Sequence, residues 1–212
     1  MFHRQSLSLL ILFFSFFALP PVAPAAEDAT QARRVIENSS EQIKQTLKQP
    51  AYQKDFDKSV RFVDGIVSEF ADMPRVALLV LGKNIRQAMP EQRQRFIEEF
   101  KTLLVRTYTR AFLDYKDWSL TFKPYADDRD DGRTIVKTVV HQPGQQPVEV
   151  NYRMLLNKQG EWKVYDIIIG GVSLVTNYRT SFNQEIAQTG SIDSVIQKLV
   201  DKNSKPVTDD KG

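Results

Sequence analysis

The chain has 212 residues, of which 29 are Lys or Arg and 26 are Asp or Glu, so its formal net charge is +3 at pH 7. This near balance argues against a nucleic-acid binder, in which basic residues are usually in strong excess. The chain has no cysteine and two histidines. These counts exclude a disulfide framework, a thiol nucleophile and a zinc site built from cysteine and histidine.

The first 26 residues have the three parts of a cleavable signal peptide. A short start that contains Arg4 precedes an apolar run over residues 7–19, and a Pro/Ala stretch with Ala23 and Ala25 ends the segment. The apolar run is shorter than the roughly 20 residues that a membrane span needs. We therefore predict a signal peptide over residues 1–26 and export of the remainder as a soluble protein.

An uncleaved membrane anchor is the alternative interpretation of this segment. Pro20 and Pro21 argue against it, because proline ends a helix where a span would have to continue. No cysteine follows the apolar run, so lipid attachment at that place is excluded. We expect one α+β domain over residues 27–202 and a polar tail over residues 203–212.

Helical periodicity dominates the first part of the domain, residues 28–116. Apolar residues recur every three or four positions, which predicts helices over residues 28–49, 57–70, 73–81 and 90–115. Asp72 is the expected N-cap of the third helix, and Gly82 is its expected stop. The fourth helix carries a wide aromatic stripe.

Strand-like periodicity replaces the helical periodicity over residues 117–169. Four strands are expected, at residues 118–125, 133–141, 148–156 and 161–169. The short connections between them contain turn residues, such as Pro143 and Gly144, and predict an antiparallel meander. Helices follow over residues 172–202, with Ser173 and Ser191 as N-caps. The predicted fold is therefore an antiparallel four-stranded meander sheet packed against flanking helices.

The sequence carries no catalytic or cofactor-binding motif. His141 is the only histidine beyond the predicted signal peptide, and its place at a strand end favours a surface position. The acidic residues around Asp127 do not have the spacing of a calcium loop, and no phosphate-binding glycine pattern is present. We therefore expect no enzyme, no metal and no cofactor.

One segment is strongly basic. From Arg75 to Arg110 there are eight Lys or Arg residues and three Glu residues. Such a face either docks a partner protein or anionic head groups, or is an ordinary solvated helix surface. The predicted docking residues are Arg75, Lys83, Arg86, Arg93 and Arg95.

Residues 61–199 resemble the periplasmic phospholipid carriers of the Mla (maintenance of lipid asymmetry) pathway, also called the toluene-tolerance family. The resemblance rests on Val80-Leu81-Gly82, Pro90-Glu91-Gln92-Arg93, Leu103 to Tyr108, Trp162-Lys163-Val164-Tyr165-Asp166, Gly171-Val172-Ser173-Leu174 and Asn177-Tyr178-Arg179.

The resemblance implies a periplasmic, non-enzymatic carrier with a deep apolar pocket between the sheet and the helices. Acyl chains would lie in the pocket, and the head group would stay at its mouth, so that a phospholipid is cargo rather than cofactor. It also implies two partners, an inner-membrane ABC transporter complex with a lipid-binding ring and an outer-membrane lipoprotein–porin complex.

The residues expected to line this pocket come from the apolar stripes of helices and strands. They are Val63, Ile66, Val67, Phe70, Phe100, Leu104, Tyr108, Val139, Val148, Val150, Tyr152, Met154, Val164, Ile168, Val172 and Val175.

Two other functions stay open at this point. A small secreted hydrolase or isomerase on a cone-shaped α+β fold would need an acid in the pocket, for which Asp114 and Asp166 are the available residues. A periplasmic adaptor or chaperone would have a filled core instead of a pocket.

Overall fold

The computed structural model describes residues 24–115, 117–124 and 132–206. Most of the predicted signal peptide (1–26), the acidic turn near Asp127 and the end of the predicted tail lie outside the described residues. Among the helices within these ranges, none combines the length and apolar character that crossing a bilayer requires.

Four helices of the first half lie where apolar periodicity predicts them: α1 (Pro24–Leu47), α3 (Phe56–Phe70), α4 (Met73–Leu81) and α5 (Pro90–Asp114). Two short helices between them were not predicted, α2 (Pro50–Gln53) and the 3-10 helix η1 (Gly82–Arg86). Asp72 caps α4, because its side chain accepts a hydrogen bond from the Arg75 backbone N–H at 3.0 Å. Gly82 ends α4 with a φ of +54°, a conformation that glycine adopts without steric cost.

The sheet contains five strands in the order β1-β2-β3-β4-β5, and all neighbours are antiparallel. They are β1 (Ser119–Phe122), β2 (Arg133–His141), β3 (Val148–Leu156), β4 (Trp162–Ile169) and β5 (Val172–Ser173). The prediction of a four-stranded sheet was therefore wrong. The fifth strand has only two residues, and after the turn at Gly170 and Gly171 it pairs back onto the end of β4, which is too short a pairing for side-chain alternation to reveal.

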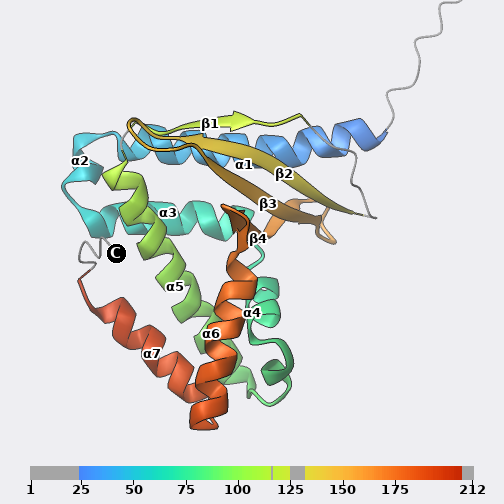
Figure 1. Ribbon diagram of the computed structural model, residues 1–212, viewed down its shortest axis with the longest axis vertical. Coiled ribbons are helices and arrows are strands. Elements are labelled where there is room, and N and C mark those ends of the chain that lie inside the picture. Colours follow the sequence, from blue (N-terminus) through green and yellow to red (C-terminus); the bar gives the residue numbers. More distant parts are fainter. Residues whose placement is uncertain (1–23, 116, 125–131, 207–212) are drawn as a thin grey trace, which may run out of the picture.

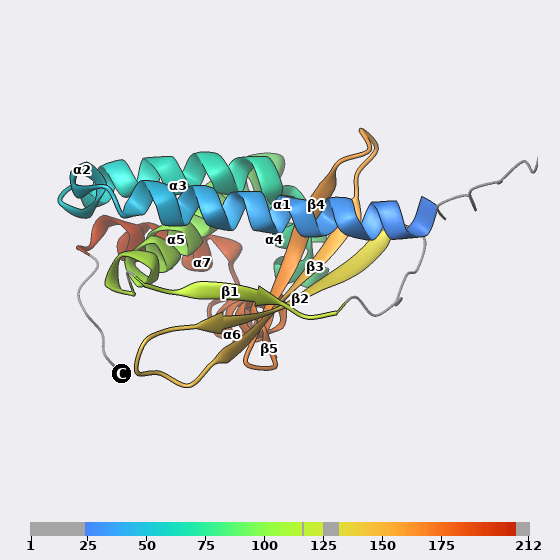
Figure 2. The same ribbon diagram turned by 90° about the horizontal axis from the view of Figure 1, so that it is seen from above.

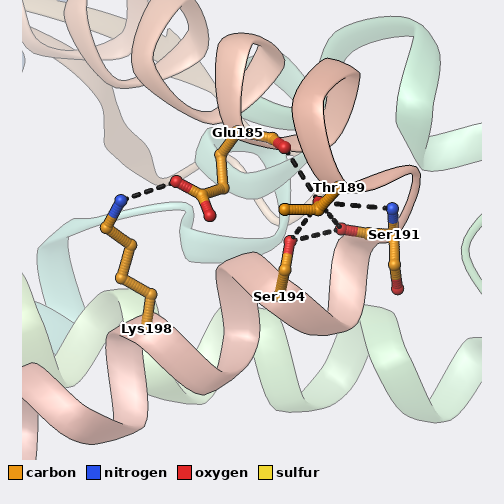
Figure 3. A network of polar contacts seen from close by, with 5 residues as sticks. All are labelled: Glu185, Thr189, Ser191, Ser194 and Lys198. Atoms are coloured by element: carbon orange, nitrogen blue, oxygen red, sulfur yellow. Dashed lines mark hydrogen bonds and ion pairs between the residues drawn. The ribbon is translucent and has the colours of Figure 1, made fainter.

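Two helices complete the described chain, α6 (Leu174–Thr189) and α7 (Ile192–Ser204). Ser173 and Ser191 cap them through side-chain oxygens, as predicted. Figure 3 shows the connection between them, where Thr189 lies within 2.8 Å of the Glu185 carbonyl and 2.6 Å of the Ser194 hydroxyl. An ion pair between Lys198 and Glu185 joins the two helices further along, so the hairpin is fixed by polar contacts at its closed end.

The elements form a sheet region and a helical region that meet at β4 (Figure 1). Helix α1 runs across the strands and lies beside α3 (Figure 2). Helices α4, α5, α6 and α7 make up the helical region, where the buried aromatic rings of Phe96, Phe100 and Phe182 pack together. A second core lies between α1 and the sheet, and a third lies between α1, α3 and α5.

Candidate functional site

A cavity of about 390 Å³ lies where these three cores meet. Its wall combines residues of all three, for example Phe100 and Val175 from the helical region, Val164 from the sheet and Val63 from α3. A volume of this size is within the range of small-molecule pockets, about 300–1,000 Å³. The three cores are thus each packed, and the space that they leave between them is not filled by side chains.

Eleven of the sixteen residues predicted to line a pocket are part of this wall. They are Val63, Val67, Phe70, Phe100, Leu104, Tyr108, Val148, Val150, Tyr152, Val164 and Val175. The strand residues among them share one face, because β3 alternates and places Val148, Val150 and Tyr152 on the same side of the sheet.

Three predicted residues from the strands, Val139, Ile168 and Val172, do not line the cavity. Val139 pairs with Glu149, so it shares the face that points away from the cavity. Val172 lies on the two-residue strand β5 and is 57 % exposed. Ile168 pairs with Asn151, and its position follows from an irregularity in β4.

That irregularity is a β-bulge at Tyr165, where Arg153 pairs with Asp166 while the next residue, Met154, pairs with Val164. A bulge inserts one extra residue and reverses the side-chain alternation beyond it. Val164 and Ile168 would share a face in a regular strand. In β4, the cavity face passes instead from Val164 to Ile167 and Ile169.

Two other predicted residues, Ile66 and Met154, are buried but do not reach the cavity. Ile66 packs in the core between α1, α3 and α5, and Met154 packs beneath α1. Both therefore hold the framework around the cavity.

The sequence interpretation missed several wall residues. They come from α1, α4, the α5–β1 connection and the first two strands: Ile36, Ile43, Met73, Val76, Val80, Trp118, Leu120 and Val140. Periodicity marks most of these as buried, since Ile36 and Ile43 are seven residues apart on one helix face. Nothing in the local pattern distinguishes a residue that faces a cavity from one that faces another side chain.

The polar residues of the wall include four tyrosines, two serines, Gln142 and Asp166. Burial raises the pKa of Tyr152 to about 12, although a hydrogen bond with Thr138 acts in the opposite direction. Burial and the neighbouring Tyr178 raise the pKa of Tyr108 as well. These phenols are therefore neutral at ordinary pH, and none of them adds charge to the wall.

Among the described residues, one acidic residue belongs to the wall, Asp166, and its carboxylate is hydrogen-bonded to other protein groups. Asp166 is 4 % exposed and accepts hydrogen bonds from Arg153 at 3.0 Å, from the Ser173 hydroxyl at 2.7 Å and from the Val175 N–H at 3.1 Å. Its contacts tie the first turn of α6 to β3 and β4. The hydrogen bonds of the Asp166 carboxylate therefore serve to hold the fold together.

The other residues considered for catalysis lie on the surface. Asp114 and His141 are both exposed and do not belong to the cavity wall. Among the residues that the structure describes, no three His, Cys, Asp or Glu side chains gather closely enough to hold a metal ion.

The wall reaches the surface between the end of α5 and the start of β3. Tyr115 and Val148 are wall residues with exposed fractions of 43 % and 37 %. Apolar and aromatic side chains therefore extend from the interior to the mouth.

The five predicted docking residues are exposed and lie on α4, η1 and the first turns of α5. They do not form one patch. Arg93 and Arg95 are two positions apart on α5, which places them about 200° apart around the helix. Arg75 is paired with Asp72 at 3.4 Å.

The family model described as "MlaC protein" matches residues 37–201 of this chain. Among curated proteins, the toluene tolerance protein ttg2D of Pseudomonas putida is 34 % identical over 110 residues, which are 51 % of this chain and 50 % of that protein. The intermembrane phospholipid transport system binding protein MlaC of Haemophilus influenzae is 26 % identical over 130 residues, 60 % of each chain. The matched regions therefore span about half to three fifths of these relatives.

A solved structure resembles the fold over a longer stretch. It is a phospholipid-binding protein from Ralstonia solanacearum in complex with a phospholipid, with a TM-score of 0.76 and 30 % sequence identity. The superposition covers 82 % of this chain and 97 % of the other. The fold is thus the same over nearly all of that protein.

Proposed function

The chain belongs to the MlaC family, and on this premise we propose that it is a periplasmic phospholipid carrier that performs no chemical step. In this proposal the cavity encloses acyl chains, while the head group remains at the mouth near Tyr115 and Val148. The observation that carries the proposal is the apolar cavity, which side chains do not fill. Its wall extends to the surface at Tyr115 and Val148. Among the described wall residues, the one charged residue, Asp166, is paired with Arg153.

The energetics of lipid transfer explain why such a cavity is needed. Exposing two acyl chains of about 15 methylenes each to water costs roughly 24 kcal/mol, at ~0.8 kcal/mol per methylene. A carrier has to offset most of this cost, yet it must also release the lipid. An aliphatic wall does both, because it replaces the bilayer interior without adding directional bonds to the chains.

The neutral tyrosines suit the same task. An unpaired charge in the cavity would lose its hydration when chains enter, and each unsatisfied polar group costs about 1–3 kcal/mol. The one carboxylate of the wall is held by three hydrogen bonds, so bound chains would not have to desolvate it.

The proposal includes the two partners that a periplasmic carrier requires. An inner-membrane ABC transporter complex with a lipid-binding ring would exchange lipid on one side, and an outer-membrane lipoprotein–porin complex would do so on the other. Energy for directional flow would come from the ATPase, since the carrier itself provides only burial.

The test is detergent-free purification from periplasm, followed by solvent extraction and mass spectrometry. The wild type should contain phospholipid. Val150→Glu places a carboxylate on the cavity face and should lose the lipid while remaining folded, as checked by circular dichroism.

The matched control is Ile135→Glu, because Ile135 lies on the opposite face of the sheet, paired with Arg153. This variant should keep its lipid. A wild type that is repeatedly empty and takes up no added phospholipid would overturn the proposal, as would full lipid content in Val150→Glu.

A further inference from the structure

Helix α1 buries one stripe of its surface, and two serines interrupt this stripe. Ile36 is 3 % exposed and Ile43 is 5 % exposed, and their spacing places them on the same helix face. Ser39 and Ser40 lie between them, three or four positions from each, so the buried face passes through both serines. Where the periodicity favours a large aliphatic side chain, α1 therefore has two small ones.

The interruption lies where α1 borders the cavity. Ile36 packs in the core between α1 and the sheet, and Ile43 packs in the core between α1, α3 and α5. Helix α1 runs across the strands and beside α3 (Figure 2). Ser39 and Ser40 follow Ile36 and precede Ile43 along this helix, and both line the cavity. The wall of the cavity on the α1 side is therefore made in part of serine side chains.

The small size of these side chains accounts for part of the cavity volume. An apolar cavity of about 150 Å³ binds benzene, so each carbon atom takes about 25 Å³. Leucine has two more side-chain heavy atoms than serine, and leucines at both positions would therefore occupy about 100 Å³ more. This is about a quarter of the cavity, which has a volume of about 390 Å³.

The hydroxyl of Ser40 is already used within the helix. It donates a hydrogen bond to the Glu37 carbonyl at 2.9 Å, so it leaves no unsatisfied donor that an acyl chain would have to desolvate. The neighbouring helix α3 lines the cavity with the apolar residues Val63, Val67 and Phe70. Ser40 thus provides room for an apolar chain rather than a polar contact.

We propose that Ser39 and Ser40 are the selectivity positions of the cavity, because they give long acyl chains the room that larger side chains would take. The inference rests on the proposed carrier function, since it concerns the chains of the carried phospholipid. Each methylene that finds no room in the cavity stays in water, which weakens binding about fourfold. The carrier therefore accepts chains as long as oleoyl, and filling the α1 side narrows it to shorter chains.

The experiment compares the wild type with the double variant Ser39→Leu, Ser40→Leu. Both proteins are purified without detergent, delipidated and incubated with vesicles that contain equal amounts of dimyristoleoyl and dioleoyl phosphatidylglycerol, which share a head group and differ in chain length. Mass spectrometry of the bound lipid gives the ratio of the dioleoyl to the dimyristoleoyl form. This ratio should be at least about fourfold lower in the variant, and equal ratios in the two proteins would overturn the proposal.

Two controls separate the volume of the side chains from their other properties. Ser39→Ala, Ser40→Ala removes the hydroxyls without filling the space and should keep the wild-type ratio. Asn38→Leu, Gln42→Leu adds two leucines at exposed positions of α1 outside the wall and should keep it as well. A fall in the alanine variant would assign the selectivity to the hydroxyls, and a fall in the second control would assign it to the helix surface; either would overturn the proposal.

Folding and lipid uptake are checked in the same samples. If circular dichroism shows that the double leucine variant is unfolded, the single variants Ser39→Leu and Ser40→Leu replace it, and at least one should shift the ratio in the same direction. A wild type that takes up lipid, together with unchanged ratios in all leucine variants, would overturn this inference and leave the carrier function standing. A wild type that takes up neither lipid would overturn the carrier function and this inference with it.

Discussion

At the scale of single residues, Asp166 shows how a buried charge can serve the fold rather than a reaction. Its carboxylate receives hydrogen bonds from β3, from the cap of α6 and from the first turn of α6. The sequence places Asp166 in a strand that borders the pocket, which is why it qualified as a possible catalytic acid. Only the positions of Arg153 and Ser173 show that its lone pairs are occupied.

We expect Asp166→Ala to lower the free energy of unfolding by about 3 kcal/mol, because it removes the acceptor of three hydrogen bonds and leaves the buried Val175 N–H without a partner. Urea denaturation measures this change. Glu98→Ala removes an exposed carboxylate that is bonded to Gln94 and should change the free energy by less than about 0.5 kcal/mol. Similar values for the two variants would contradict the structural role.

Tyr152 gives the protein a predictable response to alkali. Burial raises its pKa to about 12, above the value of about 10 for a free tyrosine, so folding favours the protonated phenol. Its contribution to stability is therefore complete below pH 10 and is lost as the pH rises from 10 to 12.

The free energy of unfolding of the wild type should accordingly decline between pH 10 and pH 12, and Tyr152→Phe should decline less over the same range. Chemical denaturation at several pH values measures both, and the absorbance of tyrosinate follows the ionisation directly. An identical decline in the two proteins would show that Tyr152 is not a late-titrating group.

At the scale of elements, the bulge in β4 decides which residues reach the cavity. Before Tyr165 the cavity side carries Val164, and beyond it the same side carries Ile167 and Ile169. The run of three isoleucines at the end of β4 gives no alternation from which the face of each could be predicted. The structure therefore distinguishes two neighbouring isoleucines: Ile169 lines the cavity and Ile168 does not.

We expect Ile169→Glu to lose bound phospholipid and Ile168→Glu to retain it, because only the first carboxylate would face the acyl chains. Phospholipid per protein, measured by mass spectrometry after detergent-free purification, tests the pair. Loss in both variants or in Ile168→Glu alone would mean that the alternation beyond the bulge is assigned to the wrong face.

At the scale of the whole molecule, the proposed lipid cargo should contribute to stability. Three packed cores enclose a space of about 390 Å³, and an unfilled apolar space lacks the dispersion contacts that close packing provides. A lipid that fills this space binds the folded state and not the unfolded one.

Removal of lipid should therefore lower the melting temperature, and added phospholipid should restore it. At a free lipid concentration 100 times the dissociation constant, the gain is about 2.7 kcal/mol. Differential scanning calorimetry of native, delipidated and reloaded protein measures it. Equal melting temperatures in all three would indicate that the cavity holds no lipid in the folded protein.

The sequence by itself determined the long helices, four of the strands and their order, because capping residues, turn residues and apolar periodicity act locally. Asp72, Ser173 and Ser191 mark helix starts, and four of the five strands are visible from their patterns. It also determined most of the buried face of β3. The family resemblance, rather than periodicity, supplied the expectation of a pocket.

Only the tertiary structure decided that the interior is hollow and which residues surround the space. Val63 and Ile66 are both buried and are three residues apart on one helix, so periodicity does not distinguish them. In the structure, Val63 lines the cavity and Ile66 packs against other side chains. The bulge at Tyr165 and the two-residue strand at Val172 are likewise invisible to alternation. The physical reason is that periodicity reports whether a side chain leaves water, whereas a cavity depends on how separate elements pack against one another.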